Sequence, residues 1–121
     1  MLVVDDAPDI RFLLEVSLSR EPKVRLVGQA ENGEQAVEKI EKLRPDLVVM
    51  DMHMPIMDGV AATRRVSELW PNIEIVGFTS SGSSRAHDAM CEAGAVKSFD
   101  KSDVIPLLEF IRTRAATRGE A

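Results

Sequence analysis

Five short runs of apolar residues alternate along the chain with stretches whose apolar residues recur at helical spacing. The runs are rich in Val, Ile and Leu and occupy residues 1–4, 24–27, 47–50, 73–78 and 96–99. After the first run, Ile10, Leu14 and Leu18 share one helical face, and the later runs are followed by similar stretches. Apolar strands that alternate with helices are typical of a parallel sheet covered on both faces. The sequence therefore predicts an α/β fold, a doubly wound five-stranded parallel sheet of (βα)5 type.

Residues at the boundaries of these segments agree with this division. Ser83 and Ser102 are predicted N-caps, because a serine hydroxyl accepts hydrogen bonds from the free amides of a first helical turn. Pro106 falls in the first turn after Ser102, where proline is tolerated. We expect one domain over residues 1–115, with 116–121 as a C-terminal tail or the start of a linker.

Charge and composition exclude several classes of function. The formal net charge of −5 disfavours direct binding to nucleic acid and to anionic membranes. The single cysteine, Cys91, cannot form an internal disulfide, which fits a reducing compartment. No apolar run approaches the roughly 20 residues that span a bilayer. We expect a cytoplasmic protein that does not bind membranes.

Polar residues collect where the predicted strands end. Asp5 and Asp6 follow the first run, Asp51 follows the third, Thr79 follows the fourth, and the fifth leads to Lys101. In an open parallel sheet, ligands bind outside the carboxyl ends of the strands. The five side chains are therefore predicted to meet in one site.

The chemistry of this set indicates a site for a metal ion and a phosphoryl group. Clustered carboxylates repel one another unless a cation lies between them, and all-oxygen ligands favour Mg²⁺, with Mn²⁺ as an alternative. Lys101 supplies a compact positive charge for phosphoryl oxygens, and Thr79 supplies a hydroxyl donor. The Asp51 carboxylate needs no general base and is itself a candidate nucleophile.

Four motifs in this order resemble the receiver domain of bacterial two-component response regulators, as in the chemotaxis response regulator. The motifs are VVDD, MDMHMPIMDG, GFTSS and GAVKSFDKS, at residues 3–6, 50–59, 77–81 and 94–102. The resemblance covers essentially the whole chain. It implies the flavodoxin-like strand order 2-1-3-4-5 and a phosphorylation-activated signalling switch.

The resemblance also implies a role for each acidic residue. Asp51 would be the phosphoacceptor, taking a phosphoryl group from a sensor histidine kinase or a phosphotransfer protein. Asp6, Asp51 and the backbone carbonyl of His53 would bind Mg²⁺, and Asp5 would bind it through a water molecule. The domain would then catalyse only its own aspartyl phosphorylation and dephosphorylation, so we expect it not to be an enzyme.

Thr79 and Lys101 would hold the phosphoryl oxygens, again by resemblance. In the family, movement of the hydroxyl residue couples to an output face formed by the fourth helix, the fifth strand and the fifth helix. That face would change its affinity for a downstream effector or a fused output domain. It is also a candidate surface for homodimerisation.

The signal relay departs from the family pattern. The switch aromatic of the family usually lies three residues before the lysine, and that residue here is Ser98. Phe99 is adjacent, but neighbouring strand residues point to opposite faces of a sheet. Phe99 could replace the aromatic only through a one-residue slip or bulge. Ser98 and Phe99 are therefore both candidates for the relay.

Three further residues near the site carry weaker predictions. The side chain of His53 and that of Ser81 are candidates for tuning the lifetime of the phosphoryl group, by shielding it from water or admitting water. His87 is expected to be an exposed residue of the fourth helix.

Three alternative functions remain open. A Mg²⁺-dependent phosphatase or phosphotransferase with an aspartyl nucleophile normally has a second Asp two residues later, where this chain has His53. A flavin-binding module would need a hydroxyl-rich phosphate loop in place of DDAPD at residues 5–9. A degenerate receiver that binds partners without phosphorylation would not need the complete set of Asp, Thr and Lys residues.

Overall fold

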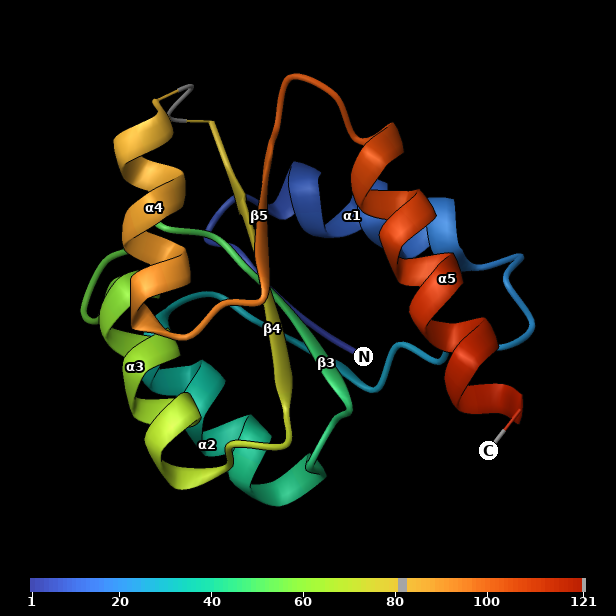
Figure 1. The fold of residues 1–121 in the computed structure, drawn as a ribbon, viewed down its shortest axis with the longest axis horizontal. Helices are drawn as coiled ribbons and strands as arrows, with labels where there is room; N and C mark the ends of the chain where they lie inside the picture. The colour runs from blue at the N-terminus through green and yellow to red at the C-terminus, as the bar shows by residue number, and fades with distance from the viewer. Residues whose placement is uncertain (81–82, 121) are drawn as a thin grey trace.

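A computed structural model describes residues 1–80 and 83–120. In this part of the chain five strands and five helices alternate, which confirms the predicted (βα)5 order (Figure 1). The strands are β1 (Leu2–Val4), β2 (Gly28–Ala30), β3 (Leu47–Met50), β4 (Glu74–Thr79) and β5 (Lys97–Asp100). The helices are α1 (Pro8–Leu18), α2 (Gly33–Leu43), α3 (Gly59–Leu69), α4 (Ser84–Ala93) and α5 (Ile105–Glu120).

The strands form one parallel sheet in the order β2-β1-β3-β4-β5, as predicted. Helices α1 and α5 cover one face, and α2, α3 and α4 cover the other (Figure 1). Because the order reverses direction beside β1, the ends of β1 and β3 lie next to each other at the switch point. Val4 pairs with Met50 at the last position of these two strands.

Alternate strand residues point to opposite faces, and this divides the core into two layers. One layer packs strand residues against α2, α3 and α4, and its members include Leu2, Val4, Val48, Met50, Ile75 and Met90. The other packs against α1 and α5, and its members include Val3, Leu14, Val49, Val76, Phe78 and Ile111. Both layers close tightly around the sheet, so the strand ends are held in fixed positions.

The second strand lies later in the sequence than predicted. The expected run was 24–27, whereas β2 is Gly28–Ala30 and pairs with β1 from Leu2 onward. Val24 and Leu26 do pack against the α1 and α5 layer, but their backbone precedes the paired strand. The apolar pattern therefore predicted that Val24 and Leu26 pack against the core. Hydrogen bonding to β1 decided which residues form the strand. Strands β4 and β5 begin and end one residue later than predicted, for the same reason.

One of the two predicted N-caps is correct. The Ser83 hydroxyl accepts a hydrogen bond from the Arg85 amide at 3.2 Å and caps α4. The prediction for Ser102 is wrong, because the Asp103 carboxylate accepts from the Ile105 amide at 3.0 Å where α5 begins. The amide of Ser102 instead donates to Asp100. Asp103 lies one residue nearer to the helix, within reach of its first amide.

Helix α5 is the longest helix and continues to Glu120. The predicted tail at 116–121 thus overlaps the helix as far as Glu120, and the domain boundary at 115 stays a prediction. Among the described residues, no helix is long and apolar enough to cross a membrane.

Gly59, the first residue of α3, lies directly against the backbone of Asp51. A Cβ atom there would come within 1.8 Å of the Asp51 carbonyl oxygen, and backbone atoms cannot yield cheaply. Gly59→Ala is therefore expected to lower the free energy of unfolding by about 2–4 kcal/mol in urea titrations.

Gly28→Ala is the matched control. Its Cβ would meet only terminal methyl groups, Leu43 Cδ1 at 3.1 Å and Leu2 Cδ1 at 3.2 Å. These side chains can shift, so the loss should stay below about 1.5 kcal/mol. Equal losses in the two variants would contradict this explanation.

Candidate functional site

Backbone pairing beyond the strand ends brings two acidic residues together. The amide of Asp5 donates to the Ala30 carbonyl oxygen at 3.0 Å, and that of Asp51 donates to the Val4 carbonyl oxygen at 2.9 Å. Each residue thus continues the ladder of its own strand for one position. Since β1 and β3 are neighbours, the side chains of Asp5 and Asp51 emerge at the same edge.

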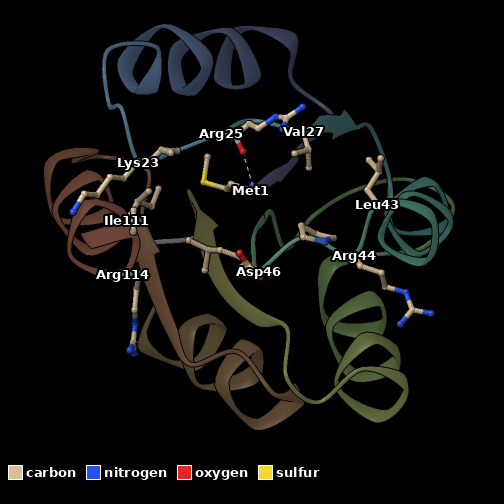
Figure 2. A pocket seen from close by; sticks show the side chains of 13 residues that line it. Met1, Lys23, Arg25, Val27, Leu43, Arg44, Asp46, Ile111 and Arg114 are labelled. Atoms are coloured by element: carbon tan, nitrogen blue, oxygen red, sulfur yellow. Dashed lines mark hydrogen bonds between the residues drawn. The ribbon is translucent and has the colours of Figure 1, made fainter. Parts of the chain in front are cut away.

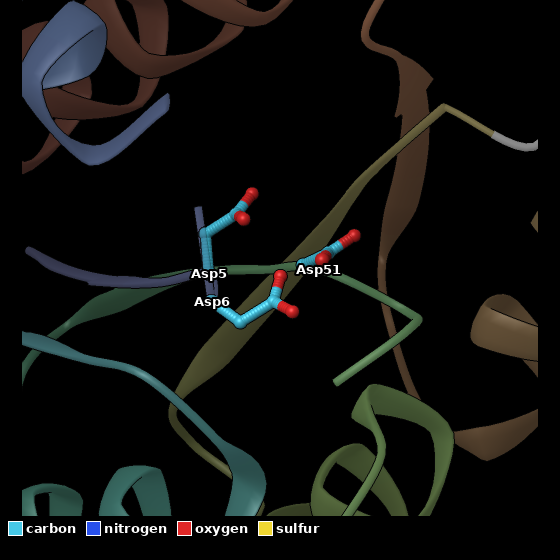
Figure 3. A group of neighbouring side chains, drawn as sticks. All are labelled: Asp5, Asp6 and Asp51. Atoms are coloured by element: carbon cyan, nitrogen blue, oxygen red, sulfur yellow. The ribbon is translucent and has the colours of Figure 1, made fainter. Parts of the chain in front are cut away.

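Asp6 completes an acidic cluster with Asp5 and Asp51. One carboxylate oxygen of each residue lies within 4.8 Å of the others, and Figure 3 shows the three side chains at the adjoining ends of β1 and β3. Asp5 and Asp51 are 2% and 4% exposed, while Asp6 faces solvent. The cluster combines two buried carboxylates with one that is open to an incoming ion.

Lys101 provides a positive charge between the two buried carboxylates. Its Nζ atom lies 2.7 Å from Asp5 Oδ2 and 3.3 Å from Asp51 Oδ1. Burial alone would lower the pKa of Lys101, but hydrogen bonding and attraction to Asp5, and then to Asp51, raise it overall. The ammonium group is therefore charged at neutral pH and partly neutralises the cluster.

The acidic cluster still disfavours ionisation of Asp51. Burial raises the pKa of the Asp51 carboxyl above its ordinary value, and the nearby charge of Asp5 adds to this. Lys101 and the Met52 amide, which donates to Asp51 Oδ1 at 2.9 Å, oppose the rise without cancelling it. One lysine does not fully compensate the buried charge, so a further cation would stabilise it.

These residues fit a metal ion. Three carboxylates that converge without a Cys or His side chain form a hard, all-oxygen ligand set. Burial, and then the charge of Asp5, raise the pKa of Asp51, and Asp6 beside it is exposed, so a divalent cation at these carboxylates would stabilise the ionised form of Asp51. The structure supports a metal-binding site at Asp5, Asp6 and Asp51.

Thr79 lies at the same edge and is fully buried at the end of β4. Its carbonyl oxygen accepts a hydrogen bond from the Lys101 amide at 2.9 Å, which fixes where the lysine leaves β5. His53 is exposed in the loop that follows Asp51. Ser81, the other residue predicted to tune phosphoryl lifetime, lies outside the described residues.

The two relay candidates point to opposite faces. Ser98 pairs with Gly77 and Phe99 with Phe78, so the β4–β5 ladder continues in register without the slip or bulge that Phe99 would need. Phe99 packs on Phe110 of α5, with ring centroids 5.6 Å apart. Ser98 therefore lies on the α4 face, together with Thr79.

His87 does not match its prediction as an exposed residue. Its ring is half-buried between α4 and β5, with Nδ1 2.5 Å from Ser98 Oγ. The sequence pattern placed it next to the buried Ala86 but could not show that its ring reaches Ser98 on β5. The sequence also missed Arg11, whose guanidinium donates to the Asp5 carbonyl oxygen at 2.6 Å.

A cavity of about 430 Å³ lies at the opposite end of the sheet, beside Met1 and Leu47. Figure 2 shows the basic side chains around it, Lys23, Arg25, Arg44 and Arg114, extending outward from its rim. The guanidinium of Arg44 stacks on Trp70, and that of Arg114 pairs with Glu74 at 3.4 Å. The cavity has no set of polar groups that converge on a ligand, unlike the acidic edge.

The sequence model of the response regulator receiver domain matches residues 1–111. The chain belongs to the response regulator receiver domain family. It is a receiver domain of two-component response regulators, a phosphorylation-activated switch.

Similar proteins include both curated relatives and solved structures. The receiver domain is 37% identical over 122 residues to a protein-glutamate methylesterase/protein-glutamine glutaminase of Syntrophus aciditrophicus, covering 98% of this chain and 35% of that protein. It is 30% identical to a LuxR-family two-component response regulator from Aurantimonas sp., with a TM-score of 0.87. The match covers 96% of this chain and 84% of that one. It is 28% identical to the response regulator domain of Thermotoga maritima CheB, with a TM-score of 0.82. The match covers 94% of this chain and 92% of that one.

The expectation that the protein is not an enzyme is wrong. Curated relatives are named as methylesterases and glutaminases, which are enzymes. The chain spans about a third of the length of the first of these relatives, and the match lies in a receiver domain. The prediction considered only the chemistry of the acidic cluster, which carries no information about a catalytic centre elsewhere in a longer protein.

Asp51→Asn is expected to stabilise the metal-free receiver domain at neutral pH. The folded-state pKa of Asp51 lies above its ordinary value of 3.8, so the folded chain binds this proton more tightly than the unfolded chain. Stability from this group is therefore present below about pH 4 and is lost as the pH rises through the folded-state pKa. The variant should raise Tm by about 2–5 °C at neutral pH and by little at acidic pH.

Thermal unfolding in a chelator across this pH range measures the difference. Asp9→Asn, an exposed carboxylate in the first turn of α1, is the control and should show no comparable gain. A stabilisation by Asp51→Asn that is equal at acidic and neutral pH would show that ionisation of Asp51 is not its cause.

Proposed function

We propose that Asp51 is the phosphoacceptor of this receiver domain and takes its phosphoryl group from a sensor histidine kinase or a phosphotransfer protein. The observation that carries the proposal is the position of Lys101, within 3.3 Å of Asp51 and 2.7 Å of Asp5. A carboxylate oxygen of Asp51 attacks the phosphorus atom, and the bond from phosphorus to the donor breaks. The carboxylate acts without a general base.

A divalent cation, Mg²⁺ or Mn²⁺, would assist this transfer. Asp6, Asp51 and the backbone carbonyl of His53 would bind it directly, and Asp5 would bind it through water. Lys101 holds Asp5 at 2.7 Å, which supports an indirect role for Asp5, whereas exposed Asp6 is open to the ion. The metal would neutralise charge that develops on the phosphoryl oxygens.

Thr79 and Lys101 would then bind the phosphoryl group. Phosphorylation adds about 1.5–2 negative charges to a cluster that is already acidic. The Lys101 ammonium, now shared between two carboxylates, would move toward the new oxygens, and the Thr79 hydroxyl would donate to them. Both residues are joined through the Lys101 amide, so their movement would displace the end of β5 as a unit.

The partners follow from this switch. The relatives named as methylesterases suggest the first output to test, a catalytic domain whose activity the receiver would control. A separate effector or a homodimer that forms through α4, β5 and α5 would use the same face. The proposal places the domain in the cytoplasm, without direct contact to nucleic acid or membrane.

Phosphorylation is tested by intact mass after incubation with Mg²⁺ and acetyl phosphate. We expect one added phosphoryl group, labile to hydroxylamine, because acyl phosphates react with this nucleophile. Asp51→Asn should abolish the addition, whereas Asp58→Asn, which keeps an N-cap side chain on α3, should retain it. Modification of Asp51→Asn equal to that of the wild type would reject Asp51 as the acceptor.

Mg²⁺ binding is tested separately by thermal unfolding. Saturating Mg²⁺ should raise the Tm of the wild-type domain by about 2–5 °C, because the ion binds only the folded state. Asp6→Asn should remove most of this gain without unfolding the protein, since Asp6 is exposed. Asp9→Asn should keep it. An undiminished Mg²⁺ effect in Asp6→Asn would contradict the proposed ligand set.

A further inference from the structure

Two small residues, Gly77 and Ser98, face α4 at neighbouring positions of β4 and β5. Gly77 pairs with Ser98, and a Cβ atom on Gly77 would lie 2.5 Å from Ser98 Oγ. Only glycine fits opposite this serine rotamer. The Cβ atom of Met90 on α4 would be 3.5 Å from the same point, so α4 packs directly over this pair.

The imidazole of His87 extends from α4 to Ser98 on β5. Nδ1 lies 2.5 Å from Ser98 Oγ, and Nε2 lies 3.8 Å from Asp100 Oδ2. The ring is 24% exposed and therefore partly shielded from competing water. One α4 side chain thus contacts two residues of β5 on the same face.

These β5 residues connect His87 to the acidic edge. Asp100 pairs with Thr79 in the ladder and directly precedes Lys101, which contacts Asp5 and Asp51. The backbone amide and side chain of Ser102 hold the pKa of the Asp100 carboxyl below its usual range, so it is ionised at neutral pH. The end of β5 therefore contacts α4 through Asp100, and the next residue, Lys101, contacts the acidic edge.

We propose that His87 and Ser98 form a latch between α4 and β5 that stabilises the unphosphorylated conformation and opens when Asp51 carries a phosphoryl group. The inference rests on the proposed function. Hydrogen bonds weaken steeply as their geometry departs from optimum, so the bond between His87 Nδ1 and Ser98 Oγ is sensitive to displacement of β5 relative to α4. Movement of Thr79 and Lys101 toward the phosphoryl group shifts the end of β5 relative to α4 and lengthens the bond. In this chain the link between α4 and β5 is a hydrogen bond between His87 and Ser98, at the position where the family usually has an aromatic side chain on β5.

Thermodynamic linkage gives the direction of the expected effect. If the latch favours the unphosphorylated conformation, its removal makes the phosphorylated conformation relatively more stable. The affinity for a phosphoryl mimic then rises by the factor by which the equilibrium between the two conformations has shifted. A single side-chain hydrogen bond corresponds to about a three- to tenfold change in affinity. Phosphorylation conversely frees α4 to change its contacts with a partner.

The test is calorimetric titration of the Mg²⁺-loaded domain with the phosphomimetic ion BeF₃⁻. We expect Ser98→Ala and His87→Ala each to tighten binding about three- to tenfold. The double variant should bind no more tightly than either single variant, because both lose the same bond. His87→Asn, whose amide can reach the position of Nδ1, should stay near the wild type, and Ser84→Ala, exposed on α4, is the matched control.

Unchanged BeF₃⁻ affinity in Ser98→Ala would overturn the latch proposal. The His87–Ser98 bond would then be a structural contact that does not distinguish the two conformations. Weaker binding would assign the bond to the phosphorylated conformation and would also overturn it. If His87→Ala does not fold, Ser98→Ala decides, because it removes one oxygen atom. In the wild type, the ¹⁵N shift of His87 Nδ1 should change on BeF₃⁻ binding, and an unchanged shift would argue against opening.

The two proposals can fail separately. A wild-type domain that neither binds BeF₃⁻ nor accepts a phosphoryl group rejects the proposed function. A wild-type domain that does both, with variants of equal affinity, rejects only the latch.

Discussion

The ammonium group of Lys101, held between Asp5 and Asp51, is the interaction on which the acidic edge depends. Two carboxylates that are 2% and 4% exposed would repel each other strongly without it. This lysine explains how the chain carries Asp51 to the end of its most apolar strand. The compensation is incomplete, as the raised pKa of Asp51 shows, and the remaining charge makes the cluster receptive to a divalent cation.

The parallel sheet places this lysine through backbone bonds, so local chemistry and global fold are coupled. The Lys101 amide bonds to the Thr79 carbonyl oxygen, and the Asp51 amide bonds to that of Val4. Any force that pulls Lys101 also acts on β4 and β5 together. On the α4 face of β5, Ser98 and Asp100 contact His87. One side chain therefore connects α4 to the strand that would move. The geometry thus gives an acidic site a short physical route to a surface helix.

Much of the fold could be predicted from the sequence because its signals are local. The apolar runs at 47–50 and 73–78 predict buried strands, and Ser83 caps a helix through its own chain neighbours. Predictions failed where a distant partner decided the outcome. In the segment 24–27, Val24 and Leu26 pack inward, yet pairing with β1 begins the strand only at Gly28. Asp103 rather than Ser102 accepts a hydrogen bond from the first amide of α5, because it lies one residue nearer to the helix.

The sequence by itself determined the fold class, the strand order implied by resemblance, and the five residues at the strand ends. The fold class and the five residues follow from periodicity and residue type, which are written along the chain, whereas the strand order follows from the motifs shared with receiver domains. Only the tertiary structure decided that Ser98 lies on the α4 face, that Phe99 packs on α5, and that His87 reaches Ser98 from α4. The reason is physical: a side chain's face follows from register between strands, and its partner follows from the room that residues far away in sequence leave beside it.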